Sequence, residues 1–354
     1  MNTWGPWSPC TPGCAAPAAP PVPAAVAWRR TGALARTVAG ALLRGGRIAE
    51  PAVLRSRAQA VLDALDVRLD VRMSGRPEWQ GGPATVPGGS GPLTVPGRGG
   101  TLVVANHISW LDVIALLAVE PVTMLAKRQV ADWPVVGPLT RRAGTLFIDR
   151  DSLRSLPGTV DRMSGLLRDG RSVMVFPQGV TWCAGTGGTF RRATFQAALD
   201  AGAPIRPVTL DYLQHRGPTT VAAFVGDDDF ATSLRRVNRA AGLTVRVTVH
   251  PPLLPAPGDD RRALAARARA AVAGVRAAVA APDHPASHHP ASHHPASRHR
   301  ASDHPASDPP VTDRQTPPIR PPHPAMLTAC APCTPCWWGS TTIRSSPWAA
   351  ASTM

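Results

Sequence analysis

The sequence predicts an α/β fold with a largely parallel sheet flanked by helices. Short apolar runs of strand length alternate with longer helical patterns from residue 67 to residue 281. Polar residues suited to chemistry follow several of these runs directly, and such residues gather at the carboxyl edge of a parallel sheet. A helical segment over residues 28–66 comes before this region, and a low-complexity segment over residues 282–354 follows it.

The hydrophobic pattern gives the bounds of each expected element. Residues 67–72 alternate strictly between apolar and polar, which predicts a half-exposed strand, whereas 101–105 is a short apolar run typical of a buried strand. Pro204 and Pro207 predict an edge or bulged position for the strand 203–210. The other expected strands cover residues 122–126, 144–148, 172–176, 220–225 and 244–250, and the expected helices cover 51–66, 109–119, 129–143, 152–169, 190–201, 230–241 and 261–281.

The chain of 354 residues carries a formal net charge of +15, from 38 basic and 23 acidic residues. Such an excess suits anionic partners, including membrane surfaces. Almost all the basic residues are arginine, and Lys127 is the only lysine, so part of the charge reflects a compositional bias. The single tyrosine and the lack of a basic motif interleaved with aromatic residues argue against nucleic acid as a partner.

Both ends of the chain are expected to be disordered. Residues 1–27 are rich in Pro and Ala, and residues 282–354 contain degenerate Pro-Ala-Ser-His-His repeats, compositions that cannot build an apolar core. Five of the six cysteines lie in these ends, which excludes a disulfide framework and fits a reducing compartment. Cys330-x-x-Cys333-x-x-Cys336 has metal-ligand spacing but lacks a fourth ligand, so no metal site is expected there.

Residues 28–48 predict a basic amphipathic helix. Leu34, Val38 and Leu42 recur every four residues as an apolar stripe. Either the helix lies on an anionic bilayer with this stripe down, or it covers the domain as an ordinary helix. No transmembrane helix or signal peptide is expected, because the uncharged stretch 14–28 is short, contains prolines and lacks a charged start. The arginines around the stripe are Arg29, Arg30, Arg36, Arg44 and Arg47.

The stretch TLVVANHISWLD, residues 101–112, carries the strongest catalytic signal. A buried strand ends before His107 and a helix begins near Ser109, so His107 lies at the mouth of the sheet. The positive end of the helix dipole disfavours imidazolium, and a neutral imidazole can accept a proton from a hydroxyl. Asp112 in the first helical turn can bond the other ring nitrogen, fix the tautomer and stabilise the imidazolium that forms.

A structural interpretation of the same residues stands beside the catalytic one. Ser109-x-x-Asp112 is also a capping box, in which Asp112 bonds the helix backbone and His107 is a surface residue.

Three later segments also place polar residues just after expected strands. These residues are Lys127, Arg150 and the pair Gln178-Gly179. Because the carboxyl ends of parallel strands meet at one edge of a sheet, we expect all of them to lie near His107. This convergence favours the catalytic interpretation.

Four short blocks follow one another between about residues 60 and 250. The first is Asn106-His107-x-Ser109-x-x-Asp112, and the third is Phe176-Pro177-Gln178-Gly179. The second joins Ala126-Lys127, Pro134-x-x-Gly137-Pro138 and Gly144-x-x-Phe147-Ile148-Asp149-Arg150, and the fourth joins Phe190-Arg191-Arg192-Ala193-Thr194-Phe195 to Ala201-Gly202-Ala203-Pro204-Ile205-x-Pro207-Val208. In order and spacing these blocks resemble the glycerolipid acyltransferases of the 1-acylglycerol-3-phosphate type, whose first block is a His-four-spacer-Asp motif.

The resemblance implies transfer of a fatty acyl group from a thioester, on acyl-CoA or acyl carrier protein, to the hydroxyl of a lysolipid such as 1-acylglycerol-3-phosphate. His107 is then the general base, Asp112 orients it, Lys127 and Arg150 hold an anionic head group, and backbone N–H groups near Gly179 add to that cradle. The chemistry requires no cofactor, and no Gly-x-Ser-x-Gly elbow for a covalent nucleophile occurs. The expected location is the cytoplasmic face of the cell membrane, as a peripheral protein of phospholipid biosynthesis.

The chain departs from the family pattern at its third block. Gln178 stands where the family has Glu, and Val180 stands where it has Thr. Gln can bond an acceptor hydroxyl or phosphate but cannot act as a base, so the acceptor can differ, for instance a lyso-aminolipid. The alternatives are a lipid-binding membrane-surface protein with weakened catalysis and a metal-binding protein defined by the tail. For Arg150, the alternative is a surface ion pair with a neighbouring aspartate.

Overall fold

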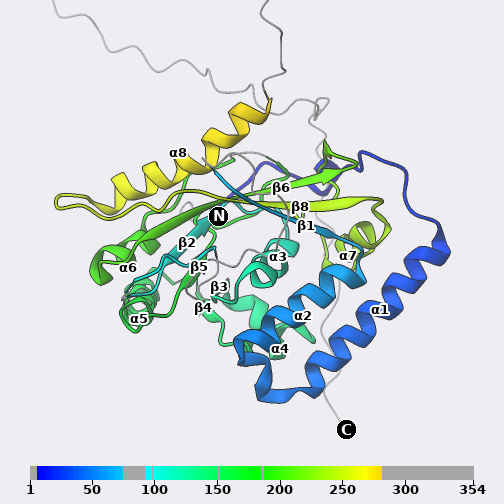
Figure 1. Cartoon of the computed structure of the whole chain (residues 1–354), viewed down its shortest axis with the longest axis horizontal. Helices are drawn as coiled ribbons and strands as arrows, with labels where there is room; N and C mark the ends of the chain where they lie inside the picture. The colour runs from blue at the N-terminus through cyan, green and yellow to red at the C-terminus, as the bar shows by residue number, and fades with distance from the viewer. Residues whose placement is uncertain (1–5, 75–91, 98, 150–151, 185–186, 281–354) are drawn as a thin grey trace, which may run out of the picture. The chain divides into compact units, whose positions relative to one another are not determined.

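The computed structural model describes residues 6–74, 92–97, 99–149, 152–184 and 187–280. Within them the strands form one sheet in the order β1-β8-β6-β2-β5-β3-β4, with β7 paired to β6 (Figure 1). Neighbouring strands run parallel except where β6 meets β8 and β7, which confirms the expected largely parallel α/β fold. The strands are β1 (Arg68–Met73), β2 (Leu102–Ala105), β3 (Thr123–Lys127), β4 (Leu146–Ile148), β5 (Val173–Val175), β6 (Ile205–Gln214), β7 (Gly217–Pro218) and β8 (Leu243–Val249).

Helices cover both faces of the sheet because its central strands are apolar on both sides. In β2, Val103 and Ala105 face a core shared with α2, α3 and α7, whereas Leu102 and Val104 face a core shared with α5, α6 and α8. The helices are α1 (Ala24–Leu43), α2 (Pro51–Ala64), α3 (Leu111–Val119), α4 (Val136–Arg142), α5 (Leu156–Arg168), α6 (Ala193–Ala201), α7 (Phe230–Arg239) and α8 (Arg261–Ala280), with 3-10 turns at Pro12–Cys14, Gly45–Ala49, Arg128–Asp132 and Leu153–Ser155.

The expected edge position of the sixth strand is wrong. β6 lies between β8 and β2 in the sheet and is buried along almost its whole length. Pro207 is tolerated there because the antiparallel pairing with β8 begins one residue later, at Val208, so the missing N–H removes no bond of that ladder.

Residues 220–225 form a turn rather than the expected strand. Most of their apolar side chains are buried, and two of their carbonyl groups bond a side chain instead of a neighbouring strand. The Arg236 guanidinium of α7 donates to the carbonyls of Val221 (2.9 Å) and Ala223 (2.6 Å). One arginine side chain therefore supplies hydrogen bonds that a neighbouring strand would otherwise supply to this apolar run. Hydrophobic periodicity cannot reveal such a partner.

Residues 6–23 lie against the domain instead of being disordered. Backbone N–H groups of this segment donate to Gln214 Oε1 from Ala18 (2.8 Å) and to the Arg239 carbonyl from Val22 (2.9 Å). Cys10 is buried. These hydrogen bonds to the domain hold the segment, although its composition cannot form a core of its own. Residues 1–5 and the low-complexity tail, with Cys330, Cys333 and Cys336, lie outside the described residues.

The stripe on α1 packs toward the domain. Leu34 packs against the main core, and Val38 and Leu42 are partly buried. Arg30, expected among the basic residues around the stripe, is buried, and its guanidinium donates to the carbonyls of Asn238 and Ala240, both at 2.9 Å. The stripe therefore serves to cover the domain. Across the described ranges, no helix combines the length and the apolar content needed to cross a bilayer.

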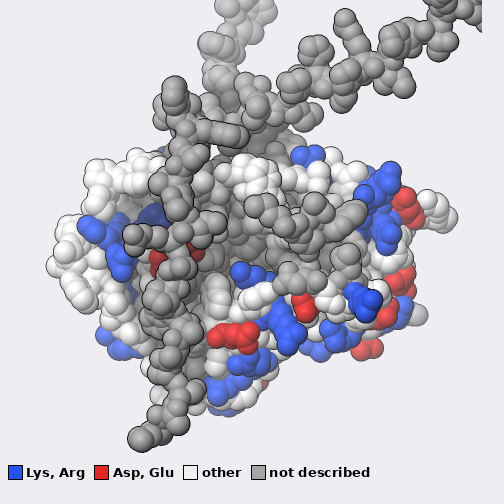
Figure 2. Space-filling model, turned by 180° about the vertical axis from the view of Figure 1, so that it is seen from behind, with Lys and Arg blue, Asp and Glu red and all other residues white. Residues whose placement is uncertain are grey.

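The basic excess is partly paired within the fold. Arg246 contacts Asp70 at 2.8 Å, and Arg236 contacts Asp228 at 2.6 Å. On the face seen in Figure 2, Lys and Arg side chains are interspersed with Asp and Glu side chains and do not form one continuous basic surface. The net charge therefore does not by itself mark a binding surface on that face.

Candidate active site

Asn106 fixes the chain where it leaves β2. Its side-chain amide donates to the Leu210 carbonyl (2.9 Å) and accepts the Leu210 N–H (2.8 Å), so it takes the place of a backbone partner for β6. The residue is buried, and the next residue, His107, stands at the carboxyl edge of the sheet, as the sequence predicts.

Asp112 contacts both the His107 ring and the backbone, as the catalytic and the structural interpretations of the sequence respectively expect. Its Oδ2 lies 2.8 Å from His107 Nδ1 and also accepts the N–H groups of Ile108 (2.7 Å) and Ser109 (2.9 Å). The carboxylate is fully buried. One oxygen therefore bonds the backbone of the loop that leads into α3 and also orients the imidazole. Because a carboxylate oxygen only accepts, Nδ1 is the donor in this contact.

Tyr212 of β6 completes the environment of this carboxylate. Its hydroxyl donates to Asp112 Oδ1 at 2.6 Å. Burial and the negative charge of Asp112 raise the pKa of Tyr212 well above its ordinary value, so the phenol stays a donor at neutral pH. No sequence motif indicates a role for this residue, because the contact depends on which face of β6 meets α3.

The His107 ring is held from a second side by Phe176, which follows β5. The two rings stack with centroids 3.9 Å apart and an interplanar angle of 11°. The His107 side chain remains 20% exposed, which leaves the ring accessible to a substrate. His250 differs, because burial lowers its pKa to about 4 and Thr209 Oγ1 lies 2.8 Å from its Nε2.

Gln178 lies beside His107 but is buried. Its Oε1 accepts the His107 N–H at 2.7 Å, and its Nε2 donates to the Gly187 carbonyl. Both polar atoms of the side chain thus bond the backbone, so Gln178 positions the loop after β5 rather than projecting into open space. Gly179 closes the turn with a φ of +76°, and its N–H donates to the Phe176 carbonyl at 3.0 Å.

Of the two cationic residues expected near His107, Lys127 and Arg150, the structure describes only Lys127. Lys127 ends β3, and its Nζ lies 5.7 Å from the centroid of the Trp133 ring, which also contacts Phe224. Phe224 donates its N–H to the Ile108 carbonyl at 2.9 Å, which links Lys127 through two aromatic residues to the neighbour of His107. Arg150 lies outside the described residues.

Arg191 is a cation near the turn that the sequence did not single out as a site residue. Its N–H donates to the Pro177 carbonyl at 2.8 Å, and a Cβ placed on Gly179 would come within 3.3 Å of Arg191 Nε. The only signal for it was its position in the fourth sequence block.

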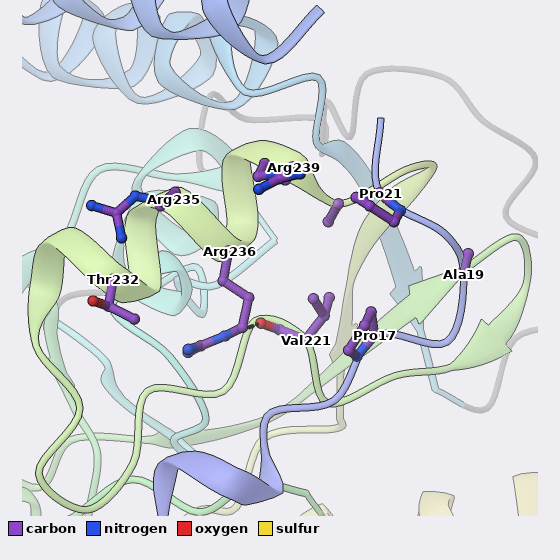
Figure 3. A pocket seen from close by; sticks show the side chains of 9 residues that line it. Pro17, Ala19, Pro21, Val221, Thr232, Arg235, Arg236 and Arg239 are labelled. Carbon is purple, nitrogen blue, oxygen red and sulfur yellow. Dashed lines mark hydrogen bonds between the residues drawn. The ribbon is translucent and has the colours of Figure 1, made fainter. Parts of the chain in front are cut away.

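A pocket of about 300 Å³ lies elsewhere, between the N-terminal segment and α7 (Figure 3). Pro17 and Pro21 line one side, and Arg235 and Arg239 line the other. The pocket shares none of its lining residues with the His107–Asp112 pair, and Arg236 beside it bonds carbonyls of the domain. We therefore do not assign the site to this pocket.

The fold and the site define an α/β domain in which a buried aspartate bonds a histidine at the carboxyl edge of a mostly parallel sheet. Residues 90–211 match the protein family described as Acyltransferase. This match confirms the resemblance to glycerolipid acyltransferases that the four sequence blocks indicate.

Curated relatives agree with this assignment. The chain is 38% identical over 169 residues to the lyso-ornithine lipid O-acyltransferase of Pseudomonas aeruginosa, covering 48% of this chain and 65% of that protein. It is 37% identical over 163 residues to the 1-acyl-sn-glycerol-3-phosphate acyltransferase of Neisseria meningitidis, covering 46% of this chain and 64% of that protein. The chain therefore matches slightly less than two thirds of the length of these relatives.

A solved structure supports the fold alone. The crystal structure of the 1-acyl-sn-glycerophosphate (LPA) acyltransferase PlsC from Thermotoga maritima aligns with a TM-score of 0.50 at 17% sequence identity. The alignment covers 73% of this chain and 96% of that one.

The hydroxyl of Tyr212 gives a direct test of the site geometry, because it is the only tyrosine in the chain. Its raised pKa predicts that the folded protein develops phenolate absorbance only at a higher pH than the urea-unfolded protein, which titrates at about pH 10. Because the folded state keeps a proton that the unfolded state loses, the free energy of unfolding should fall as the pH rises above about 10. Ionisation of the folded protein at the same pH as the unfolded chain would contradict the buried contact, and Tyr212→Phe provides the blank.

Proposed function

We propose that this protein transfers a fatty acyl group from an acyl thioester to the hydroxyl of a lysolipid. The observation that carries the proposal is the 2.8 Å contact between His107 Nδ1 and the buried Asp112 carboxylate. This contact leaves Nε2 as the basic nitrogen of a partly exposed ring, which is what deprotonation of a hydroxyl requires.

The reaction follows from that arrangement. Nε2 of His107 takes the proton of the acceptor hydroxyl. The hydroxyl oxygen at the same time forms a bond to the thioester carbonyl carbon. When the tetrahedral intermediate collapses, the carbon–sulfur bond breaks and the thiolate leaves with the proton that Nε2 returns. Asp112 stabilises the imidazolium between the two proton transfers, so the histidine acts first as base and then as acid.

The substrates follow by analogy. The named relatives act on 1-acyl-sn-glycerol-3-phosphate and on lyso-ornithine lipid, and we propose a lysolipid of one of these two kinds as the acceptor. Lys127 and Arg150 would hold an anionic group of the acceptor, with the backbone near Gly179. Acyl-CoA or acyl carrier protein would supply the acyl group, and the reaction needs no further cofactor.

The test is thiol release from acyl-CoA and from acyl-carrier-protein donors in the presence of each lysolipid. His107→Ala should lower acceptor-dependent release by about 10²–10⁴-fold, the usual contribution of a general base. Asp112→Asn should lower it as well, since the ring loses the charge that stabilises imidazolium. His215→Asn is the matched control, because His215 is exposed in the turn after β6 and should keep full activity.

Turnover unchanged in His107→Ala would refute the mechanism. No release by the wild type with any donor and acceptor would favour the alternative of a lipid-binding protein with weakened catalysis.

Gln178→Glu tests how the altered third block acts. A carboxylate still accepts the His107 N–H but cannot donate to the Gly187 carbonyl, so two oxygens would face each other. We expect the free energy of unfolding to fall by about 1–3 kcal/mol and turnover to fall with both acceptors. Unchanged stability with a shifted acceptor preference would instead indicate direct contact between residue 178 and the acceptor.

We also propose a peripheral location at the cytoplasmic face of the cell membrane, with the outer face of α1 as the contact. Trp28 and Leu43 are 75% and 87% exposed, and fifteen residues, about four helical turns, separate them on one side of α1. Exposed arginines flank them, and aromatic and basic side chains together suit the interface of an anionic bilayer. They are Arg29, Arg36 and Arg44.

Vesicle flotation tests this contact. The wild type should float with vesicles that contain phosphatidylglycerol, and the double variant Trp28→Ser/Leu43→Ser should float about fivefold less, because it loses the inserted apolar side chains. Leu254→Ser removes an exposed leucine on the loop after β8 and should bind as the wild type does. Equal flotation of all three proteins would refute α1 as the contact.

A further inference from the structure

Three thiols from distant parts of the sequence meet beside the loop that follows β5. The sulfur atoms of Cys10, Cys14 and Cys183 all lie within 4.8 Å of one another, and those of Cys10 and Cys183 are 3.3 Å apart. Cys10 and Cys183 are buried, and Cys14 is partly buried. Neither the proposed acyl transfer nor the packing of a core requires three thiols at one point.

We propose that these three cysteines bind a zinc ion, with a water molecule in the fourth position. Cys10 and Cys14 have the Cys-x-x-x-Cys spacing of zinc ligands, and the 3-10 turn Pro12–Cys14 between them brings both sulfurs to one side of the segment. Zinc–sulfur bonds of about 2.3 Å in tetrahedral geometry put the sulfurs roughly 3.8 Å apart. That separation is slightly longer than the 3.3 Å between the sulfurs of Cys10 and Cys183 and lies within the 4.8 Å that encloses all three, so small side-chain movements complete the site.

The surroundings suit thiolate ligands. The N–H of Cys183 donates to Cys10 Sγ at 3.4 Å, a bond that a negatively charged sulfur strengthens. Zinc binding replaces the three thiol protons, which pass to solvent, and the resulting complex of three thiolates and Zn²⁺ carries one negative charge.

The site would fasten the N-terminal segment to the loop next to His107. A Cβ on Gly179 would come within 3.1 Å of Pro6 Cβ, so the segment lies against the Phe176–Gly179 turn. Cys183 follows that turn by four residues. A bond from Cys10 and Cys14 to Cys183 through one ion would therefore hold the segment over the wall of the site without any role in the chemistry.

Metal content of the full-length chain tests the proposal independently of acyl transfer. The three tail cysteines also have metal-ligand spacing, so the reference protein carries Cys330→Ser, Cys333→Ser and Cys336→Ser. This protein should retain about one zinc per chain after dialysis, and its cobalt form should show thiolate-to-metal charge-transfer absorption. Cys14 is the least buried of the three ligands. Adding Cys14→Ser to this protein should lower its zinc content at least about fivefold and remove the charge-transfer absorption. Circular dichroism shows whether the fold is retained.

Two outcomes would overturn the zinc site. The first is that the three tail substitutions abolish zinc binding, whereas Cys14→Ser alone, in the chain with its native tail, leaves the zinc content unchanged. The second is a protein that holds no metal although it was purified under reducing conditions with added zinc, and whose mass is lower by two hydrogens. That mass would mean a disulfide between Cys10 and Cys183 in place of the zinc site. Loss of zinc in Cys14→Ser with the fold retained supports the site, and Cys10→Ser should reproduce it.

Discussion

The buried carboxylate of Asp112 is the interaction on which the site depends. A charge removed from water costs free energy unless donors surround it. Here the His107 ring, the N–H groups of Ile108 and Ser109 and the Tyr212 hydroxyl all donate to it. These donors come from the loop between β2 and α3 and from the strand β6. The carboxylate is therefore held from both elements, and the orientation of the imidazole follows from it.

The central place of β6 makes this possible. β6 runs parallel to β2 and antiparallel to β8, and its residues alternate between the two faces. Leu210 meets Asn106 and Tyr212 meets Asp112, so two residues of one strand, two positions apart, hold both ends of the His107 loop. A shift of one residue in the register of β6 would turn Tyr212 to the opposite core. The register of the sheet therefore also sets the geometry of the His107–Asp112 pair.

The parts of the site that depend on local order could be predicted from the sequence, and the others could not. The His107–Asp112 pair is visible because a strand-to-helix junction places residues five apart in contact. Tyr212 and Cys183 are brought in by strand register and by a loop, and nothing near them in the sequence marks their partners. Pro207 misled the expectation for β6, because only the starting point of the pairing with β8 makes a proline acceptable in a central strand.

The glutamine of the third block has a physical explanation in the loop after β5. Its amide accepts from the His107 backbone and donates to Gly187, two roles that a carboxylate cannot combine. Gly187 in turn lies so close to the Trp182 ring that a Cβ would come within 2.1 Å of it. The substitution of Gln for Glu therefore matches the path of this loop. The same path carries Cys183 to the N-terminal segment, so the loop that holds Gln178 beside His107 also contacts that segment.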